Sequence, residues 1–425
     1  MFRKLFVMVA CCSCPMLFAL SEYQMQPREY QPPQSVPQTS FMHTVDIPTY
    51  QRKFNEPIQD WLKETIDQEL SHFKQDKITQ RGLNATYNRF LKYPFPVNHY
   101  LRRYRIIGER IYACGNIAPR ENDLVLRTLA RLSDYPGIPN LPNVDFMINH
   151  NDGMPMNYDP PDFWIAEDKN DQAPILSGGK VAIAPYIIAV PHYFPLAGWK
   201  QRYDEVIRSR CPWREKKKAV CWRGNIMLRV HLNSPEAVIY NQLMSESRSL
   251  LCLLSLDNPY LINAGFSHQI EWIPSENAKR VFRPCVKGYL SYREYISHAY
   301  LPELDGAMIS GMGFEWKLLA NSLLFKVESP FVSWIDRGAV PYHNCIPVKQ
   351  NMENLIEMIN WAQTHDKECE IMANNGAIFA EKNASMEGIM FFFNYLFQEY
   401  EKCQDFNTKD LLQECERDPK WTRIR

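Results

Sequence analysis

An apolar run at residues 144–148 leads directly into Asn149, His150, Asn151 and Asp152, a cluster of polar side chains that could do chemistry. In an open parallel sheet, ligands bind beyond the carboxyl ends of the strands, so a strand here would present these side chains to a ligand. His150 and Asp152 are two positions apart and face the same way if the strand continues. A carboxylate at that place could act as a general base and take the proton from an attacking hydroxyl. The same residues also fit a strand that ends in an Asx-type turn and binds nothing.

A second candidate combines basic side chains with a glycine. Residues 214–218 carry an arginine, a glutamate and three lysines, the apolar residues 219–222 follow, and Arg223, Gly224 and Asn225 end the run. A guanidinium, a close backbone approach and an amide near a helix start would suit a diphosphate group, with Arg229 just beyond. The same charges could instead form a solvated edge held by surface ion pairs.

Glycines mark a third candidate. Residues 310–313 read Ser-Gly-Met-Gly and precede a helical stretch with Trp316 and Lys317. Backbone N–H groups before that helix could meet phosphate oxygens, although a glycine turn inside a helix–strand unit has the same pattern. His343 stands in a strand entry bracketed by prolines and could either lie near a ligand or be a structural histidine.

Apolar periodicity indicates the elements that would hold these residues. We expect buried strands at residues 144–148, 181–190, 219–222, 323–327 and 345–348. We expect helices at residues 55–80, 124–132, 199–209, 316–321, 351–364, 369–381 and 385–401, with Asn351 as the N-cap of the helix at 351–364. Strands separated by helices predict an α/β fold with a parallel sheet.

Length and composition limit the class of protein. The chain has 425 residues, 45% of them hydrophobic, and single cores stop growing near ~250–300 residues, so we expect two domains. Its 48 basic and 48 acidic residues give a formal net charge of zero, so no overall field favours nucleic acid. Residues 1–21 join a basic start to an apolar run, as in a signal peptide or signal anchor, and the Pro/Gln-rich residues 22–45 indicate a linker. Since no later stretch approaches ~18 uninterrupted apolar residues, membrane contact would come only through an uncleaved N-terminal segment.

Cysteine spacing and short motifs exclude several classes. Nine of the 12 cysteines lie beyond the N-terminal segment, and their spacing does not match a structural zinc site. In an oxidising compartment some of these nine thiols would pair and at least one would stay free. The sequence contains no Walker A, G-x-G-x-x-G, H-E-x-x-H or G-x-S-x-G motif.

Taken together and in this order, the pieces resemble the family 90 glycosyltransferases. This family includes capsule-associated xylosyltransferases, bacterial lipopolysaccharide-modifying enzymes and animal protein O-glucosyltransferases. The resemblance covers residues 141–400. The segments that carry it are residues 142–152, which resemble a family strand ending in Asn-x-x-Asp, then Gly198-Trp199, Cys211-Pro212-Trp213, Trp222-Arg223-Gly224-Asn225, Asp305-Gly306, residues 316–322, and His343-x-x-Ile346-Pro347-Val348.

The resemblance implies a GT-B fold of two Rossmann-like domains with a cleft between them. Residues 46–178 would form the acceptor-side domain, residues 179–384 the donor domain, and residues 385–425 a closing helix and tail. It implies inverting transfer of glucose or xylose from UDP-glucose or UDP-xylose to a hydroxyl of a protein, glycan or lipopolysaccharide acceptor, without a metal or other cofactor. Asp152 would be the catalytic base. The implied donor-binding residues are His192, Arg223, Gly224, Asn225, Arg229, Ser310, Gly311, Met312, Gly313 and Lys317.

Two other functions fit the same sequence. An arginine that the family usually places just before the Trp-Lys pair is absent here, with Gly313 three residues ahead of Trp316, so a catalytically inactive sugar- or nucleotide-binding pseudoglycosyltransferase is the main alternative. A secreted interaction protein that uses the fold as a scaffold is the third. The N-terminal segment predicts the secretory pathway, in the endoplasmic reticulum or Golgi lumen of a eukaryote, or a membrane-associated or exported protein of a bacterium.

Overall fold

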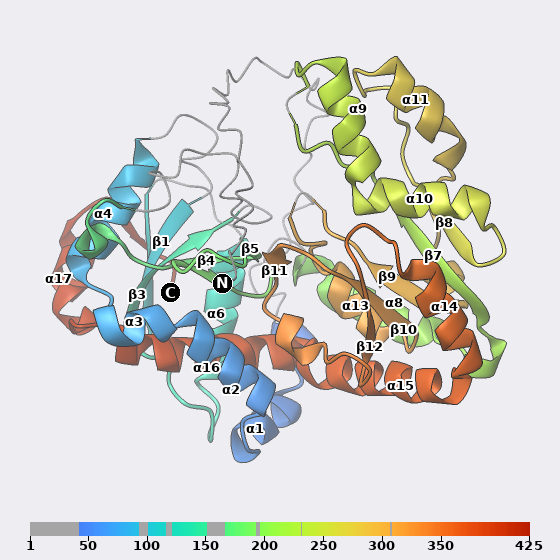
Figure 1. Cartoon of the computed structure of the whole chain (residues 1–425). Coiled ribbons are helices and arrows are strands. Elements are labelled where there is room, and N and C mark those ends of the chain that lie inside the picture. Colours follow the sequence, from blue (N-terminus) through green and yellow to red (C-terminus); the bar gives the residue numbers. More distant parts are fainter. Residues whose placement is uncertain are drawn as a thin grey trace, which may run out of the picture.

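The computed structural model describes residues 42–92, 101–115, 121–150, 166–192, 196–230, 232–306 and 308–425. Two large sheets and the helices that cover them make up this part of the chain (Figure 1). The first sheet has six strands in the order β13-β2-β1-β3-β4-β6, and the second has five in the order β12-β10-β9-β7-β8. A short ribbon of β5 (Lys180–Val181) and β11 (Phe331–Val332) accompanies them. The predicted α/β class is therefore confirmed.

The first sheet is mixed, not parallel. Its strands are β1 (Leu101–Ile107), β2 (Arg110–Cys114), β3 (Val144–Asn149), β4 (Ile175–Ser177), β6 (Ile187–Ala189) and β13 (Trp421–Arg423). Strands β3, β4 and β6 run parallel, whereas β1 is antiparallel to both β2 and β3. A tight turn with Gly108 at φ 60° joins β1 to β2, because glycine adopts this left-handed conformation without a steric cost. The prediction of a parallel sheet was therefore wrong for the part of the first sheet that contains β1, β2 and β13.

Strand β1 is buried although it contains three arginines. Asp145 on β3 accepts hydrogen bonds from Arg103 Nε at 2.6 Å and from Arg105 Nε at 2.7 Å. Burial by itself would raise the pKa of Asp145, but the two guanidinium groups outweigh it and hold that pKa below its usual range. Arg105 also stacks on Trp421 of β13, with 4.1 Å between its guanidinium carbon and the ring centroid. This ion cluster fixes β3 beside β1.

The second sheet is parallel throughout. Its strands are β7 (Lys217–Gly224), β8 (Ile262–Phe266), β9 (His298–Glu303), β10 (Leu323–Val327) and β12 (Cys345–Val348), and every neighbouring pair among them is parallel. Numbered along the chain, the spatial order is 2-1-3-4-5, which is a doubly wound arrangement. The chain leaves β7 for β8 on one side and later returns to β9 on the other, so the order reverses between β7 and β9.

The helices agree with the apolar periodicity in most places. The first group is α1 (Ile47–Asn55), α2 (Asp60–Glu69), α3 (Ser71–Asp76), α4 (Gln80–Leu91), α6 (Glu121–Leu132) and α8 (Leu196–Ser209). The middle group is α9 (Glu236–Ser245), α10 (Ser247–Asp257), α11 (Glu276–Phe282), α12 (Tyr292–Ile296) and α13 (Gly313–Leu319). The last group is α14 (Leu355–Thr364), α15 (Asp366–Asn383), α16 (Met386–Cys403) and α17 (Leu412–Arg417). No helix in the described ranges is long and apolar enough to cross a bilayer.

Three local predictions were wrong. The helix expected at residues 55–80 is divided into α2 and α3, and residues 56–59 and 77–79 are not helical. The strand expected at residues 181–190 is split into β5 and β6, because Pro185 between them has no N–H to donate to a ladder. The helix expected from Asn351 begins at Leu355 with Asn354 as its N-cap, and Asn351 instead accepts a hydrogen bond from the backbone N–H of Glu353 at 3.2 Å.

One apolar cluster spans both sheets, and a second belongs to the second sheet and its helices. The larger hydrophobic cluster includes Phe146 of β3, Leu324 of β10 and Phe397 of α16. Helices α15 and α16, red in Figure 1, run one after the other beneath the two sheets. Strand β6 and the C-terminal β13 both belong to the first sheet, so that sheet takes residues from both expected domains and from the expected C-terminal tail.

Candidate functional site

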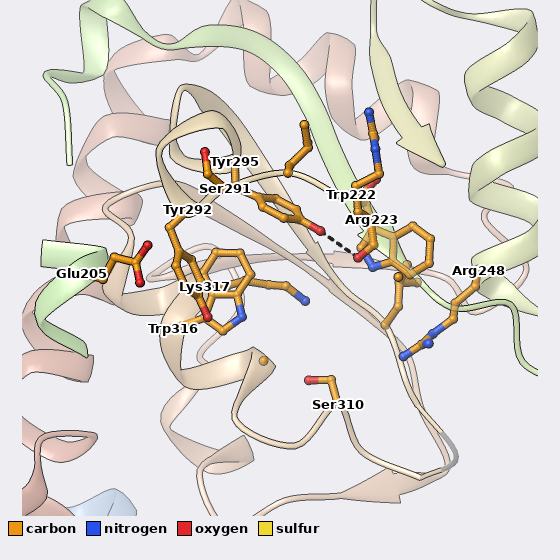
Figure 2. A pocket seen from close by; sticks show the side chains of 14 residues that line it. Glu205, Trp222, Arg223, Arg248, Ser291, Tyr292, Tyr295, Ser310, Trp316 and Lys317 are labelled. Atoms are coloured by element: carbon orange, nitrogen blue, oxygen red, sulfur yellow. Dashed lines mark hydrogen bonds between the residues drawn. The ribbon is translucent and has the colours of Figure 1, made fainter. Parts of the chain in front are cut away.

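A cavity of about 450 Å³ opens at the carboxyl ends of β7 and β9. Figure 2 shows this cavity, with side chains from β7, from the helices around it and from the segment between β9 and α13. Ligands of doubly wound sheets bind where the strand order reverses, and here that point lies between β7 and β9. The residues that line the cavity are Glu205, Trp222, Arg223, Gly224, Arg248, Leu290, Ser291, Tyr292, Tyr295, Leu304, Ser310, Gly313, Trp316 and Lys317. Charged, hydroxyl-bearing and aromatic side chains therefore surround the point where a ligand is expected.

The end of β7 forms one wall of the cavity. A Cβ on Gly224 would lie 2.5 Å from the Trp222 ring, so only glycine lets the strand pass this close to the tryptophan. Arg223 turns its guanidinium toward β8, where Nη1 donates to the Asn263 carbonyl at 2.8 Å and Nη2 to Asn263 Oδ1 at 2.9 Å. The Tyr295 hydroxyl donates to the Arg223 carbonyl at 2.7 Å, drawn as the dashed line in Figure 2. These bonds fix the carboxyl end of β7.

Arg248, near the start of α10, forms the adjacent wall. Its Nη1 donates to the Asn225 carbonyl at 3.0 Å, and its guanidinium carbon lies 5.5 Å from the Trp222 ring centroid. Burial lowers the pKa of Arg248 to about 10, so the side chain still carries its charge at neutral pH. This residue was not predicted from the sequence, because an arginine in the first turn of an apolar helix resembles an ordinary surface residue.

A third wall comes from the segment between β9 and α13. Lys317 Nζ lies 2.6 Å from Glu303 Oε2, and Ser310 Oγ also donates to the Glu303 carboxylate. A Cβ on Gly313 would lie 2.4 Å from Ser310 Oγ, so a larger residue at 313 would force Ser310 to move. The carboxylate of Glu303 therefore neutralises the charge of Lys317 and accepts the hydrogen bond of Ser310 on this wall.

The fourth wall is aromatic. Trp316 contacts Tyr292 and Tyr295 edge to face, with ring centroids 5.1 Å and 5.3 Å apart. Figure 2 shows the three rings together on the side of the cavity near Glu205. Flat apolar rings beside charged groups suit a ligand with a planar or sugar-like part and an anionic part.

The structure brings five of the ten predicted donor-binding residues to the cavity: Arg223, Gly224, Ser310, Gly313 and Lys317. The remaining five are Asn225, Arg229, Gly311, Met312 and His192, and none of them is among the lining residues.

Arg229 and Asn225 take part in the surrounding framework. Arg229 Nε lies 2.9 Å from Glu246 Oε1, and Arg229 Nη2 donates to the Gly306 carbonyl at 2.8 Å. Asn225 accepts hydrogen bonds from Arg248 and from Ser267. Met312 is buried in the core. Gly311 adopts a φ of 65° in the turn before α13, which favours glycine at that position.

His192 lies at the carboxyl edge of the first sheet instead. A Cβ on Gly178 would be 2.2 Å from the His192 ring, so the loop after β4 needs a glycine to accept the histidine. Asn149, at the end of β3, donates through Nδ2 to Ser177 Oγ at 3.2 Å, and His150 follows directly. The predicted base Asp152 lies outside the described residues.

Among the described residues, the two sheet edges approach each other where the loop after β4 meets the segment before α13. A Cβ on Gly179, just after β4, would lie 3.0 Å from the side chain of Ile309, and Ile309 directly precedes Ser310 of the cavity. Strands β5 and β11 pair antiparallel next to this contact. The carboxyl edge of the first sheet, with His192, is thereby tied to the cavity of the second.

Other candidates from the sequence lie elsewhere. His343 is exposed, and its carbonyl accepts a hydrogen bond from Asn375 at 3.0 Å. Across the described ranges, no group of three or more His, Cys, Asp or Glu side chains is arranged to hold a metal ion. The nine cysteines from Cys114 to Cys415 are all free thiols.

Fold and cavity together define an α/β protein with a cavity at the switch point of a doubly wound parallel sheet. The sequence model of glycosyl transferase family 90 matches residues 62–416, and the chain belongs to this family. The match runs from α2 to α17 and so includes both sheet edges described above.

Individual relatives are more distant. Protein O-glucosyltransferase 3 of Mus musculus is 26% identical over 159 residues, 37% of this chain and 30% of that protein. Protein O-glucosyltransferase 1 of Homo sapiens is 24% identical over 214 residues, 50% of this chain and 49% of that protein. Protein O-glucosyltransferase 2 of Danio rerio is 26% identical over 124 residues, 29% of this chain and 24% of that protein. The chain thus matches at most about half the length of each of these three relatives.

Proposed function

We propose that this protein is an inverting glycosyltransferase that moves glucose or xylose from a UDP-sugar to a hydroxyl of a protein, glycan or lipopolysaccharide acceptor. The observation that carries the proposal is the cavity between β7 and β9, which combines Arg223, Arg248 and Lys317 with an aromatic wall. Membership of glycosyl transferase family 90 and the protein O-glucosyltransferase relatives support the reaction class.

The UDP part would lie in this cavity. Cationic and hydrogen-bonding groups that line the cavity would lie beside the diphosphate, where negative charge grows as UDP departs. Trp316 and the two tyrosines beside it would contact the less polar surface of the donor. The binding energy would then fall where it assists departure of the leaving group.

The acceptor side would be the carboxyl edge of the first sheet. The acceptor hydroxyl oxygen attacks the anomeric carbon from the face opposite the diphosphate, a new C–O bond forms, and the bond to the β-phosphate oxygen breaks. The hydroxyl proton passes to the Asp152 carboxylate, and the bonding electrons leave with UDP. The loop contact between Gly179 and Ile309 is consistent with an acceptor edge next to the donor cavity.

This arrangement corresponds to a GT-B enzyme that works without a metal ion, with residues 46–178 on the acceptor side and residues 179–384 on the donor side. The N-terminal segment would direct the protein to the secretory pathway, where the acceptors would be found.

The proposal is tested by release of UDP from UDP-glucose, UDP-xylose and UDP-galactose, with and without a chelator. We expect release from UDP-glucose or UDP-xylose that the chelator does not change. Asp152→Asn should lower it about 10²–10⁴-fold, the usual contribution of a general base, while leaving UDP affinity unchanged. The double variant Asn151→Asp/Asp152→Asn is a matched control. It keeps a carboxylate in this segment but places it at position 151, so the release of UDP should stay low.

The alternative is a protein that binds a sugar nucleotide without turning it over. Two features favour it: residues 310–315 supply no cation, and Lys317 is engaged by Glu303. UDP binding by calorimetry separates the two functions, because a pseudoglycosyltransferase binds UDP and releases none from any donor. Absence of UDP binding would contradict both.

A further inference from the structure

Three cationic side chains line the cavity, but two of them are already engaged. Lys317 forms an ion pair of 2.6 Å with Glu303. Arg223 directs its guanidinium at Asn263 and at the Trp222 carbonyl, with three hydrogen bonds of 2.7–2.9 Å. A diphosphate in this cavity needs a positive charge that is not already committed to the protein.

Arg248 meets that requirement. Its one hydrogen bond within the described residues goes to the neutral Asn225 carbonyl, and no described carboxylate lies within ion-pair distance. Its Nε is buried and has no hydrogen-bond partner in the described part of the chain. Figure 2 shows the Arg248 guanidinium pointing toward the side of the cavity that carries Ser310, whereas the Arg223 side chain extends away from it.

The surrounding backbone holds this arginine in place. Arg248 is the second residue of α10, and the buried Leu251 and Cys252 anchor that helix in the core. Gly306 lies opposite: a Cβ there would come within 2.9 Å of the Ile309 carbonyl and 3.5 Å of Arg248 Nη2. A side chain at 306 would therefore crowd the space in front of the guanidinium, which glycine leaves open.

We propose that Arg248 is the principal cation that binds the diphosphate of the sugar nucleotide in this protein. The inference rests on the proposed function, because it assumes a sugar nucleotide in this cavity. It also explains how the chain can bind a diphosphate although residues 310–315 contain no arginine and Glu315, just before the Trp-Lys pair, is buried beneath Trp334.

The experiment compares UDP with uridine, which has the same base and ribose and no phosphate. Both affinities are measured by calorimetry for the wild type, Arg248→Gln, Arg248→Lys and the control Arg280→Gln. Arg280 lies on α11, and within the described residues its side chain bonds to the exposed Asn277. We expect Arg248→Gln to weaken UDP about 10–100-fold and leave uridine unchanged, with Arg248→Lys recovering part of the loss. Arg280→Gln should bind both ligands as the wild type does.

Several outcomes would overturn the inference while leaving the proposed function intact. Wild-type affinity for UDP in Arg248→Gln would show that another group holds the diphosphate. Equal weakening of UDP and uridine would show that the substitution damages the cavity as a whole. A wild type that binds no UDP would instead contradict the proposed function itself. Near-ultraviolet circular dichroism of each variant identifies loss of folding, and Arg248→Lys then provides the test.

Discussion

The buried ion cluster around Asp145 should control the stability of the first sheet. The Asp145 carboxylate is fully buried and accepts four hydrogen bonds: from Arg103 Nε and Nη2 at 2.6 and 2.7 Å, from Arg105 Nε at 2.7 Å, and from Gln80 Nε2 at 3.1 Å. Asp145→Asn removes the negative charge and turns one acceptor oxygen into an amide donor that faces guanidinium donors. The two buried arginines then share the one remaining acceptor oxygen of residue 145, while Arg105 keeps its ion pair with Glu414 at 3.0 Å and Arg103 its hydrogen bond to Asn84 at 2.6 Å.

The expected cost follows from that geometry. Removing one partner of a buried ion pair costs about 3–5 kcal/mol, because the remaining charge stays desolvated. An exposed pair gives the matched control: Asp168 Oδ2 lies 2.8 Å from Arg81 Nη2, but the two side chains are 43% and 62% exposed. Asp168→Asn should therefore cost less than about 1 kcal/mol.

Urea unfolding at pH 7, followed by circular dichroism, measures both variants. A loss for Asp145→Asn that is no larger than the loss for Asp168→Asn would refute the reasoning. The pH dependence adds a second check. Because the folded pKa of Asp145 lies below its ordinary value of 3.8, the stabilisation by this carboxylate is present above that pH and is lost as the pH falls through the folded pKa. The difference between wild type and Asp145→Asn should therefore shrink in strong acid.

Two further predictions concern residues near the sheet edges. Burial raises the pKa of Glu315 from 4.5 to about 8, so the wild type should lose stability as the pH rises from 4.5 to 8, and Glu315→Gln should reduce that loss in urea titrations at the two pH values; equal slopes for both proteins would count against a neutral buried Glu315. Gly178→Ala should destabilise the protein by about 1–3 kcal/mol in thermal unfolding, because the new methyl group would overlap His192. Gly198→Ala, on an exposed helical position with open space around it, is its control and should be neutral or stabilising; equal melting temperatures for the two variants would contradict the tight contact.

Sequence patterns predicted the strands that are buried and apolar. The runs at 144–148, 219–222, 323–327 and 345–348 appear as β3, β7, β10 and β12, and parallel strands buried on both faces have this signature. Strand β1 was missed because its arginines resemble a surface segment. Their burial depends on tertiary pairing, of Arg103 and Arg105 with Asp145 and of Arg102 with Asp123. When the partners of buried charges are distant in the sequence, no local sequence pattern indicates the strand.

Helix α12 is a different case, since a local signal was present. Ser291 and Glu294 form a capping box, with Ser291 Oγ accepting from the Glu294 N–H and the Glu294 carboxylate accepting from the Ser291 N–H. Reading that signature would have placed a short helix immediately before β9. The aromatic wall formed by Tyr292 and Tyr295 of this helix would then also have been predictable.

The candidate site was predictable in part. Arg223, Gly224, Ser310, Gly313 and Lys317 follow from motifs at the ends of strands, because strand ends converge at one edge of a parallel sheet. Which of the charged side chains face the cavity and which pair with other residues was not predictable from the sequence. Whether a lysine faces a ligand or a neighbouring carboxylate depends on a contact between segments, as the Lys317–Glu303 pair shows.

Hydrogen–deuterium exchange with and without UDP shows whether the cavity between β7 and β9 binds the UDP part of a sugar nucleotide. We expect UDP to slow amide exchange in residues 222–225 and 304–317. Exchange in residues 236–241 and 277–281, which line a second cavity beside α9 and α11, should not change. UDP binding that protects other segments and leaves residues 222–225 and 304–317 unchanged would contradict the account.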